Sequence, residues 1–175
     1  MTFQASPVKA VTGFGVQGEI QQTSPYIAQS YVLNSALASY NVMGSAFSVV
    51  SQGVAAAGNA GGTAVFAGYL SGPKEQALYG TGGNPLASSL VLPNNVSAGL
   101  VTMGIMIVYL PAAAAIGDWV VYDNVTGLLS TIAPNAALPV GKSAGFATVY
   151  QYTVTGAGLA LIQVNPYNPV PVLAA

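Results

Sequence analysis

Short runs of mainly apolar, β-branched and aromatic residues, separated by glycine-containing turns, dominate the second half of the chain. Runs of this length and composition, bounded by turn residues, are typical of β-strands. We predict strands at 101–110, 118–122, 128–132, 144–155 and 159–164. The turns at 123–127 and 156–158 would each join two of these strands into a hairpin.

The first half gives weaker signals because small residues interrupt its apolar positions. We predict a strand at 65–70, a helix of one or two turns between Pro73 and Gly80, and another strand at 86–92. Residues 31–52 alternate apolar and small polar side chains, although 33–43 fits a helix or an extended chain equally well. Residues 53–64 are mostly Gly and Ala and are predicted to form a loop.

The two ends differ from the middle. Residues 1–30 are polar and punctuated by Gly and Pro, and residues 165–175 contain too much proline for a central strand. We therefore predict an all-β protein in which a β-barrel or jelly-roll-like domain, residues 31–164, carries extended N- and C-terminal arms. Periodicity does not separate a jelly roll from other small barrels, because strand order is not encoded in it.

Charged residues are unusually scarce. Three Lys, two Asp and two Glu make up 4% of the 175 residues, whereas about 25% is ordinary for a globular domain. A surface with so few charges resists association poorly. Such a chain enters a membrane, is covered by other subunits, or polymerises.

Membrane insertion is the least favoured of these three readings. The most apolar stretch, Leu100–Ile116, is interrupted by Gly104 and Pro111 and is followed by Asp118. A spanning helix needs about 20 apolar residues without such breaks, and the residues here favour a strand. The N-terminal sequence MTFQASPVKAV also lacks the basic and apolar regions of a signal peptide. We therefore expect no membrane partner.

The chain lacks the side chains on which most catalysis and metal binding depend. It contains no His, Cys or Arg, which removes the common nucleophile–base pairs and metal sites built from His or Cys. Asp118 and Asp123 are the closest carboxylates, but each lies where it would bond backbone N–H groups in a turn. The triplet Gly141–Lys142–Ser143 lacks the remaining glycine of a phosphate-binding loop. We expect no enzyme activity and no cofactor.

Nucleic-acid binding is also excluded by charge. Affinity for phosphates rests on several Lys or Arg contacts. The three lysines, Lys9, Lys74 and Lys142, are scattered along the chain and cannot form a basic stripe.

Aromatic residues are the most distinctive candidates for binding. Tyrosine gives a large contact area at low entropic cost and is enriched at protein interfaces. Tyr150 and Tyr152 fall on one face of the strand predicted at 144–155, where core and interface are equally good interpretations, and Trp119 fits a core or interface anchor. We predict interface contacts by Phe3, Phe14, Tyr26, Tyr31, Tyr150, Tyr152 and Tyr167.

Several motifs resemble those of the structural cement proteins of tailed phages. They are FAGYLSGPKE at 66–75, LYGT at 78–81, IGDWVVYD at 116–123, TGL at 126–128, ATVY at 147–150 and GLALIQ at 158–163. The resemblance covers roughly residues 40–165 and lies in the order and spacing of the motifs. It implies a small β-barrel or jelly-roll-like domain on the outside of an icosahedral head, commonly a trimer, which clamps neighbouring major capsid protein subunits and has no catalytic residues.

The expected function is therefore that of a capsid decoration protein. Its partners would be the major capsid protein and further copies of itself, as a homotrimer, and it would be made in the host cytoplasm and located on the outer surface of the virion. Two other functions fit the low charge and the tyrosines. One is a carbohydrate- or surface-binding module of a fibre or adhesin, and the other is a self-polymerising β structural protein.

Overall fold

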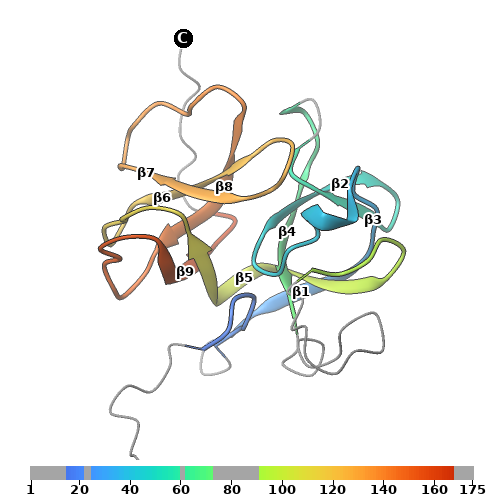
Figure 1. Cartoon of the computed structure of the whole chain (residues 1–175), viewed down its shortest axis with the longest axis horizontal. Coiled ribbons are helices and arrows are strands. Elements are labelled where there is room, and N and C mark those ends of the chain that lie inside the picture. The colour runs from blue at the N-terminus through green and yellow to red at the C-terminus, as the bar shows by residue number, and fades with distance from the viewer. Residues whose placement is uncertain (1–14, 22–24, 60–61, 73–90, 168–175) are drawn as a thin grey trace, which may run out of the picture.

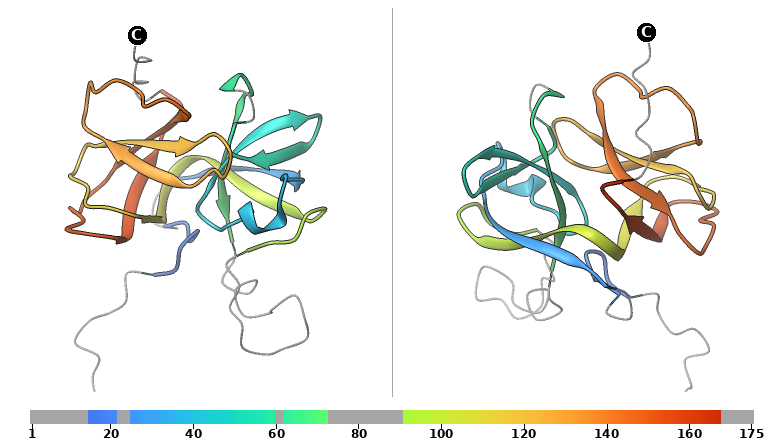
Figure 2. Two further views of the ribbon diagram at one scale, coloured as in Figure 1. Left: turned by 45° about the horizontal axis from the view of Figure 1, so that its top comes forward. Right: turned by 180° about the vertical axis from the view of Figure 1, so that it is seen from behind.

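The computed structural model describes residues 15–21, 25–59, 62–72 and 91–167. Nine strands make up nearly all of the regular structure in these ranges, together with one 3-10 turn, η1, at Ala38–Tyr40. Figures 1 and 2 show two groups of strands side by side, with β5 running through both. The strands are β1 Ile27–Leu33, β2 Ala46–Ser51, β3 Val54–Ala57, β4 Phe66–Ser71, β5 Ser97–Leu110, β6 Trp119–Asp123, β7 Leu129–Ile132, β8 Lys142–Val149 and β9 Gly158–Val164.

The first group is a closed barrel. Its strand order is β1-β3-β2-β4-β5, and β1 pairs again with the first half of β5, which closes the ring. Closure removes the free edges that an open sheet would present. The barrel interior holds a cluster of buried apolar side chains: Leu33, Met43, Phe47, Ala55, Ala57, Ala67, Leu70, Leu92, Ala98 and Leu100.

The second group is a sheet that continues from the same long strand. The second half of β5 pairs with β9, and the order continues through β8 and β6 to β7. Its buried face forms a separate core with contributions from every one of these strands, including Met106, Val108, Val120, Tyr122, Leu129, Val149 and Ile162. Tyr69 and Ala46 of the barrel also belong to this core, so the two groups pack against each other.

Glycine allows β5 to serve both groups. Gly104 has a φ of 135°, and a Cβ added there would lie 2.7 Å from the Cβ of Tyr26. Only glycine adopts this backbone conformation without strain. The pairing of β1 with β5 ends just before it, with Ile27 opposite Met103. Beyond it β5 pairs with β9, beginning with Gly104 opposite Val164.

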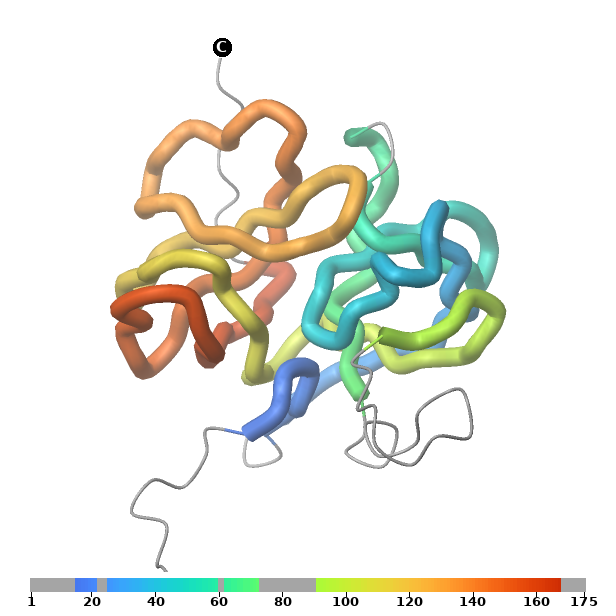
Figure 3. The backbone as a smooth tube through the Cα atoms, viewed as in Figure 1, coloured from blue at the N-terminus to red at the C-terminus, as the bar shows by residue number. Residues whose placement is uncertain are grey.

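A short N-terminal segment also pairs with β5. The Gly18 N–H donates to the Ile107 carbonyl oxygen at 2.8 Å, and the Gln21 N–H donates to Ile105. Figure 3 shows this segment beside the long strand. Residues 18–21 and 27–30, within the predicted N-terminal arm, therefore pair with β5, so β structure begins before the predicted domain boundary at residue 31.

The all-β prediction is confirmed, and the structure selects a small barrel rather than a jelly roll. The predicted strands at 65–70, 101–110, 118–122, 128–132 and 159–164 are all present within a few residues. The predicted loop at 53–64 is wrong in part, because residues 54–57 form β3 and pair with both β1 and β2. The undecided stretch 33–43 begins with the last residue of β1 and contains the 3-10 turn η1 and an isolated bridge at Val42, but no α-helix.

Other predictions lie wholly or partly outside the described residues. The helix between Pro73 and Gly80 and most of the strand at 86–92 belong to this set, as does the arm beyond Tyr167. Within the strand predicted at 86–92, the described residue Val91 forms an isolated bridge with Val42.

Candidate interaction surfaces and the cleft between the two groups of strands

Large apolar side chains are unusually frequent on the surface. Within the described ranges, fifteen of them are exposed: Val16, Tyr26, Ile27, Val32, Leu37, Val50, Val65, Tyr109, Ile116, Val125, Leu128, Val140, Tyr150, Tyr152 and Tyr167. The same ranges contain only four charged side chains, those of Glu19, Asp118, Asp123 and Lys142. Single exposed apolar residues are ordinary, so the scarcity of charged side chains is what distinguishes this surface from that of an ordinary soluble domain.

The structure places five of the seven predicted interface residues. Tyr26 and Tyr152 are about half exposed, and Tyr167 is 89% exposed. Tyr31 is half-buried on β1, where its hydroxyl donates a hydrogen bond to Gln29. Tyr150 is 37% exposed, and Phe3 and Phe14 lie outside the described residues. These five tyrosines come from three parts of the chain: β1 and the residue before it, the β8–β9 loop, and the residues after β9.

Tyr150 and Tyr152 do not share a strand face, contrary to the sequence prediction. β8 ends at Val149, and Gln151 has a φ of 68°. The Tyr152 N–H donates to the Tyr150 carbonyl oxygen at 2.8 Å, which is the geometry of a tight turn. The strand therefore ends about six residues earlier than its Thr- and Tyr-rich composition predicts.

This turn contributes to an apolar end of the second sheet. The segment 114–118 runs beside it, because the Gly117 N–H donates to Val149 and Ala114 forms a bridge with Val154. Ile116, on that segment, is 57% exposed. We call Ile116, Tyr150 and Tyr152 the end patch.

The two aspartates have structural roles, as the sequence predicts. Asp123 Oδ1 accepts hydrogen bonds from the N–H groups of Val125 and Thr126, at 2.9 and 2.8 Å, and from the Thr126 hydroxyl. Partial burial alone would raise the pKa of Asp123, but these hydrogen bonds and the positive charge of Lys142 outweigh burial and lower it. Asp118 Oδ2 accepts the Ala115 N–H at 2.8 Å. Among the described residues, no three His, Cys, Asp or Glu side chains cluster as a metal site would require.

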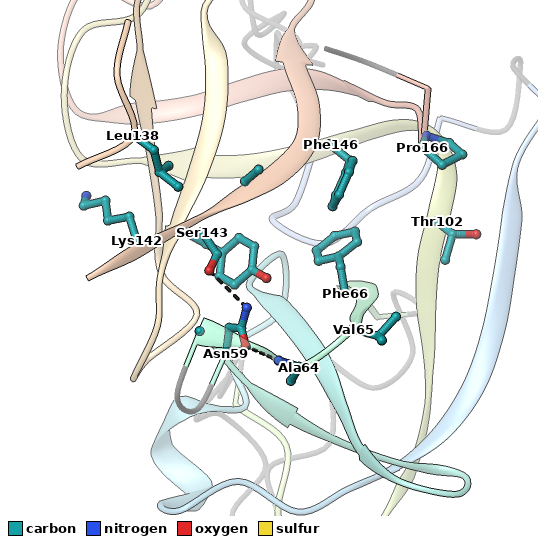
Figure 4. Close-up of a pocket in the computed structure, with 13 residues that line it drawn as sticks. Asn59, Ala64, Val65, Phe66, Thr102, Leu138, Lys142, Ser143, Phe146 and Pro166 are labelled. Carbon is teal, nitrogen blue, oxygen red and sulfur yellow. Dashed lines mark hydrogen bonds between the residues drawn. The ribbon is translucent and has the colours of Figure 1, made fainter. Parts of the chain in front are cut away.

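A cleft of about 660 Å³ lies between the barrel and the second sheet. Figure 4 shows side chains from both groups of strands around it. The barrel side and its loops contribute Asn59, Gly62, Ala64, Val65, Phe66 and Thr102, and the second sheet and its loops contribute Tyr122, Leu138, Lys142, Ser143, Ala144, Phe146 and Pro166.

Aromatic rings form the floor of this cleft. The Phe66 ring lies 5.3 Å from that of Tyr69, 5.7 Å from that of Tyr122 and 5.4 Å from that of Phe146. Burial, and then the neighbouring Tyr122, raise the pKa of Tyr69 well above its usual value. Burial also raises the pKa of Tyr122, although hydrogen bonds with Ser48, Ser143 and Asn59 partly oppose this. Both phenols are therefore neutral at ordinary pH.

The polar groups at the cleft are already paired. Asn59 Nδ2 donates to Ser143 Oγ at 3.0 Å, and Ser143 Oγ donates to Asn124 Oδ1 at 2.7 Å. Asn59 Oδ1 accepts the Ala64 N–H. Lys142 begins β8 and donates a hydrogen bond to the Ser130 hydroxyl. With these groups satisfied, the cleft offers mainly apolar contact.

The aromatic floor could not be predicted from the sequence. From the sequence, Phe66, Tyr122 and Phe146 are only members of the strands predicted at 65–70, 118–122 and 144–155. They meet because β4 of the barrel packs against β6 and β8 of the second sheet. The one available signal was Gly145, where an added Cβ would clash with the Tyr69 hydroxyl of β4.

Comparison with known proteins gives two matches that agree with this fold. The family model described as structural cement protein (E217 gp24/Pam3 gp6) matches residues 3–165. A chain from the capsid of Myoviridae phage XM1 superimposes with a TM-score of 0.60 at 17% identity, covering 95% of this chain and 99% of that chain. No curated protein matches the chain. Over the ranges that the structure describes, no helix has the length and apolarity needed to cross a membrane.

Proposed function

Since this chain belongs to the phage structural cement protein family, we propose that it binds the outer surface of a phage head and holds neighbouring major capsid protein subunits together. A structural role in the capsid follows from the family and from the fold shared with the XM1 capsid chain. The partner, the outer location and the clamping action are the proposal. Synthesis in the host cytoplasm is part of the same proposal.

The surface composition is the observation that carries this proposal. Fifteen large apolar side chains are exposed in the described ranges, against four charged ones. Permanent interfaces are more apolar than transient ones and resemble a domain core cut in half. A clamp needs contact area rather than reactive groups, and the aspartates and the cleft-lining polar groups are already engaged in hydrogen bonds within the chain.

We infer further that the protein acts as a homotrimer whose terminal arms contact adjacent subunits. Exposed apolar side chains occur on β1, in the end patch and at Tyr167, and a subunit that touches several neighbours would use contacts from more than one such region. The predicted contacts of Phe3 and Phe14 belong to the same proposal.

Two measurements test the proposal. Light scattering after size exclusion gives the mass of the purified protein, and a discrete trimer is the expected result. Co-sedimentation with heads that lack the protein should show saturable binding. Open-ended polymers would instead favour a self-polymerising structural protein, and binding to glycans without binding to heads would favour a surface-binding module.

A further inference from the structure

The cleft between the barrel and the second sheet has the properties of a binding site for an apolar chain segment. Its volume of about 660 Å³ falls within the range of roughly 300–1,000 Å³ that is usual for ligand sites. Phe66 and Phe146 provide its aromatic surface, and Val65 and Leu138 extend its apolar wall. The hydrogen bonds of Asn59 and Ser143 leave few polar groups for a charged ligand.

The backbone at Phe146 is strained in a way that serves this cleft. Phe146 has a φ of 51°, which is rare for a bulky residue. It lies in a β-bulge, since Val120 pairs with Ala147 while Val121 pairs with Ala144. Bulges redirect side chains and are frequent beside functional sites. Here the bulge directs the Phe146 ring toward Phe66 and the cleft (Figure 4).

The chain itself contains a segment whose chemistry fits. Pro166 lines the cleft, and the eight residues after Tyr167 are Asn-Pro-Val-Pro-Val-Leu-Ala-Ala. This segment, 168–175, carries no charged side chain and has proline at two of its first four positions. Proline-rich segments bind aromatic-lined grooves at low entropic cost. Fully extended, eight residues reach roughly 26 Å.

Hydrogen bonds fix the residues that immediately precede this segment. The Asn165 N–H donates to the Phe146 carbonyl oxygen, which fixes the exit point beside the bulge. Asn165 Oδ1 then accepts the Tyr167 N–H at 3.0 Å. The Tyr167 side chain is 89% exposed, so its own subunit hardly covers it.

We propose that the cleft of one copy binds residues 168–175 of a second copy. This inference rests on the proposed oligomeric capsid function and names one of its contacts. Because donor and acceptor are different surfaces, the contact is head-to-tail, and such contacts form a closed ring when the rotation between successive copies returns to the first one. Each subunit of the trimer would donate its segment to the next and receive one from the previous subunit.

The absence of native cysteine makes a disulfide test free of background. Val65→Cys, at a cleft residue that is 73% exposed, is combined in turn with Val170→Cys, Val172→Cys or Leu173→Cys in the full chain. After mild oxidation, non-reducing electrophoresis should show covalent dimers and trimers for at least one pair. The matched control replaces Val65→Cys by Val32→Cys, on β1 and outside the cleft lining, and should give far less cross-linking.

A second variant tests the chemistry of the contact. Leu173→Asp is added to whichever of the pairs with Val170→Cys or Val172→Cys cross-links better. This change should reduce the amount of covalent oligomer at least several-fold. A disulfide that forms within one chain, and so leaves the protein monomeric on the gel, would contradict the proposal. The cleft would then bind residues 168–175 of the same chain. Absence of cross-linking, or equal cross-linking from Val32→Cys, would also contradict it.

The same samples separate this inference from the proposed function. If the variants keep a trimeric mass and bind heads without cross-linking, the exchange of segments is wrong and the capsid function stands. If the native chain neither trimerises nor binds heads, the proposed function itself fails.

Discussion

The Tyr69 hydroxyl donates a hydrogen bond to the carbonyl oxygen of Gly145, and both groups are buried. Tyr69 lies on β4 of the barrel and Gly145 on β8 of the second sheet, so this bond joins the two groups of strands. A Cβ at position 145 would clash with the Tyr69 hydroxyl, which accounts for the glycine. The aromatic floor of the cleft is built around this contact, since the Tyr69 and Phe66 rings meet edge to face.

Tyr69→Phe should destabilise the protein while keeping the ring packing. The Gly145 carbonyl would lose its buried donor, at a cost of about 1–3 kcal/mol in the free energy of unfolding. Urea unfolding measures this loss. Tyr109→Phe, at a position that is 46% exposed, is the matched control and should change stability by less than about 0.5 kcal/mol. Equal stability of the two variants would show that the bond contributes nothing.

Stability should fall as the pH rises above about 10. The pKa values of Tyr69 and Tyr122 are raised in the folded chain relative to the ordinary value of 10.0, mainly by burial. Above pH 10 the unfolded chain therefore binds fewer protons than the folded one at these groups, and the free energy of unfolding decreases. The contribution is fully present below pH 10.

Urea titrations at several alkaline pH values measure this slope. Tyr69→Phe should reduce it, because one of the two buried phenols is gone, and Tyr109→Phe should leave it unchanged. If the free energy of unfolding depends on pH equally in the native chain, Tyr69→Phe and Tyr109→Phe, the dependence does not come from the buried phenols of Tyr69 and Tyr122.

Gly68→Ala should be among the most destabilising small substitutions. Gly68 has a φ of 133°, and an added Cβ would lie 2.7 Å from the Val101 carbonyl oxygen, which is backbone and cannot easily move. We expect a loss of more than about 1 kcal/mol. Gly156→Ala is the control, because a Cβ there meets nothing within 4 Å. Thermal unfolding compares the two, and a similar melting temperature would refute the steric account.

The sequence predicts the strands well where a run of apolar residues is bounded by turn residues, as in β5 and β9. It fails at β3, because Val54–Ala57 has side chains too small to reveal a strand, and this strand is specified by its neighbours on both sides. It also misses the end of β8, since Tyr150 and Tyr152 favour a strand locally while tertiary hydrogen bonds form a turn. The cleft combines residues far apart in the chain, and periodicity carries no information about which strands of different sheets meet.

The end patch offers a direct test of surface contact. Ile116→Asp should weaken binding to heads at least about tenfold, because burying an unpaired carboxylate is costly. The thermal stability of the Ile116→Asp variant should change little, because the Ile116 side chain is 57% exposed in the native chain. Ile116→Leu keeps the apolar contact and should bind as the native chain does. Unchanged binding of Ile116→Asp would exclude the end patch from the interface.

Binding to heads should depend little on ionic strength. Few charges are available on the subunit, so screening has little to act on, even between about 0.01 and 1 M salt, where the Debye length falls from about 30 to 3 Å. Sulfate salts should strengthen the association, because they favour burial of apolar surface. Co-sedimentation across a salt series measures both effects. A steep loss of affinity in sodium chloride would show that electrostatic contacts dominate instead.

The most direct test of the central claim is the temperature at which heads release their DNA, measured with a DNA-binding dye. Heads that lack the protein are compared with the same heads saturated with it, and the Ile116→Asp variant serves as the control for added protein. A clamp between capsid subunits should raise the release temperature with the native chain, and less so with the variant. An unchanged release temperature on heads that demonstrably carry the protein would contradict a stabilising role.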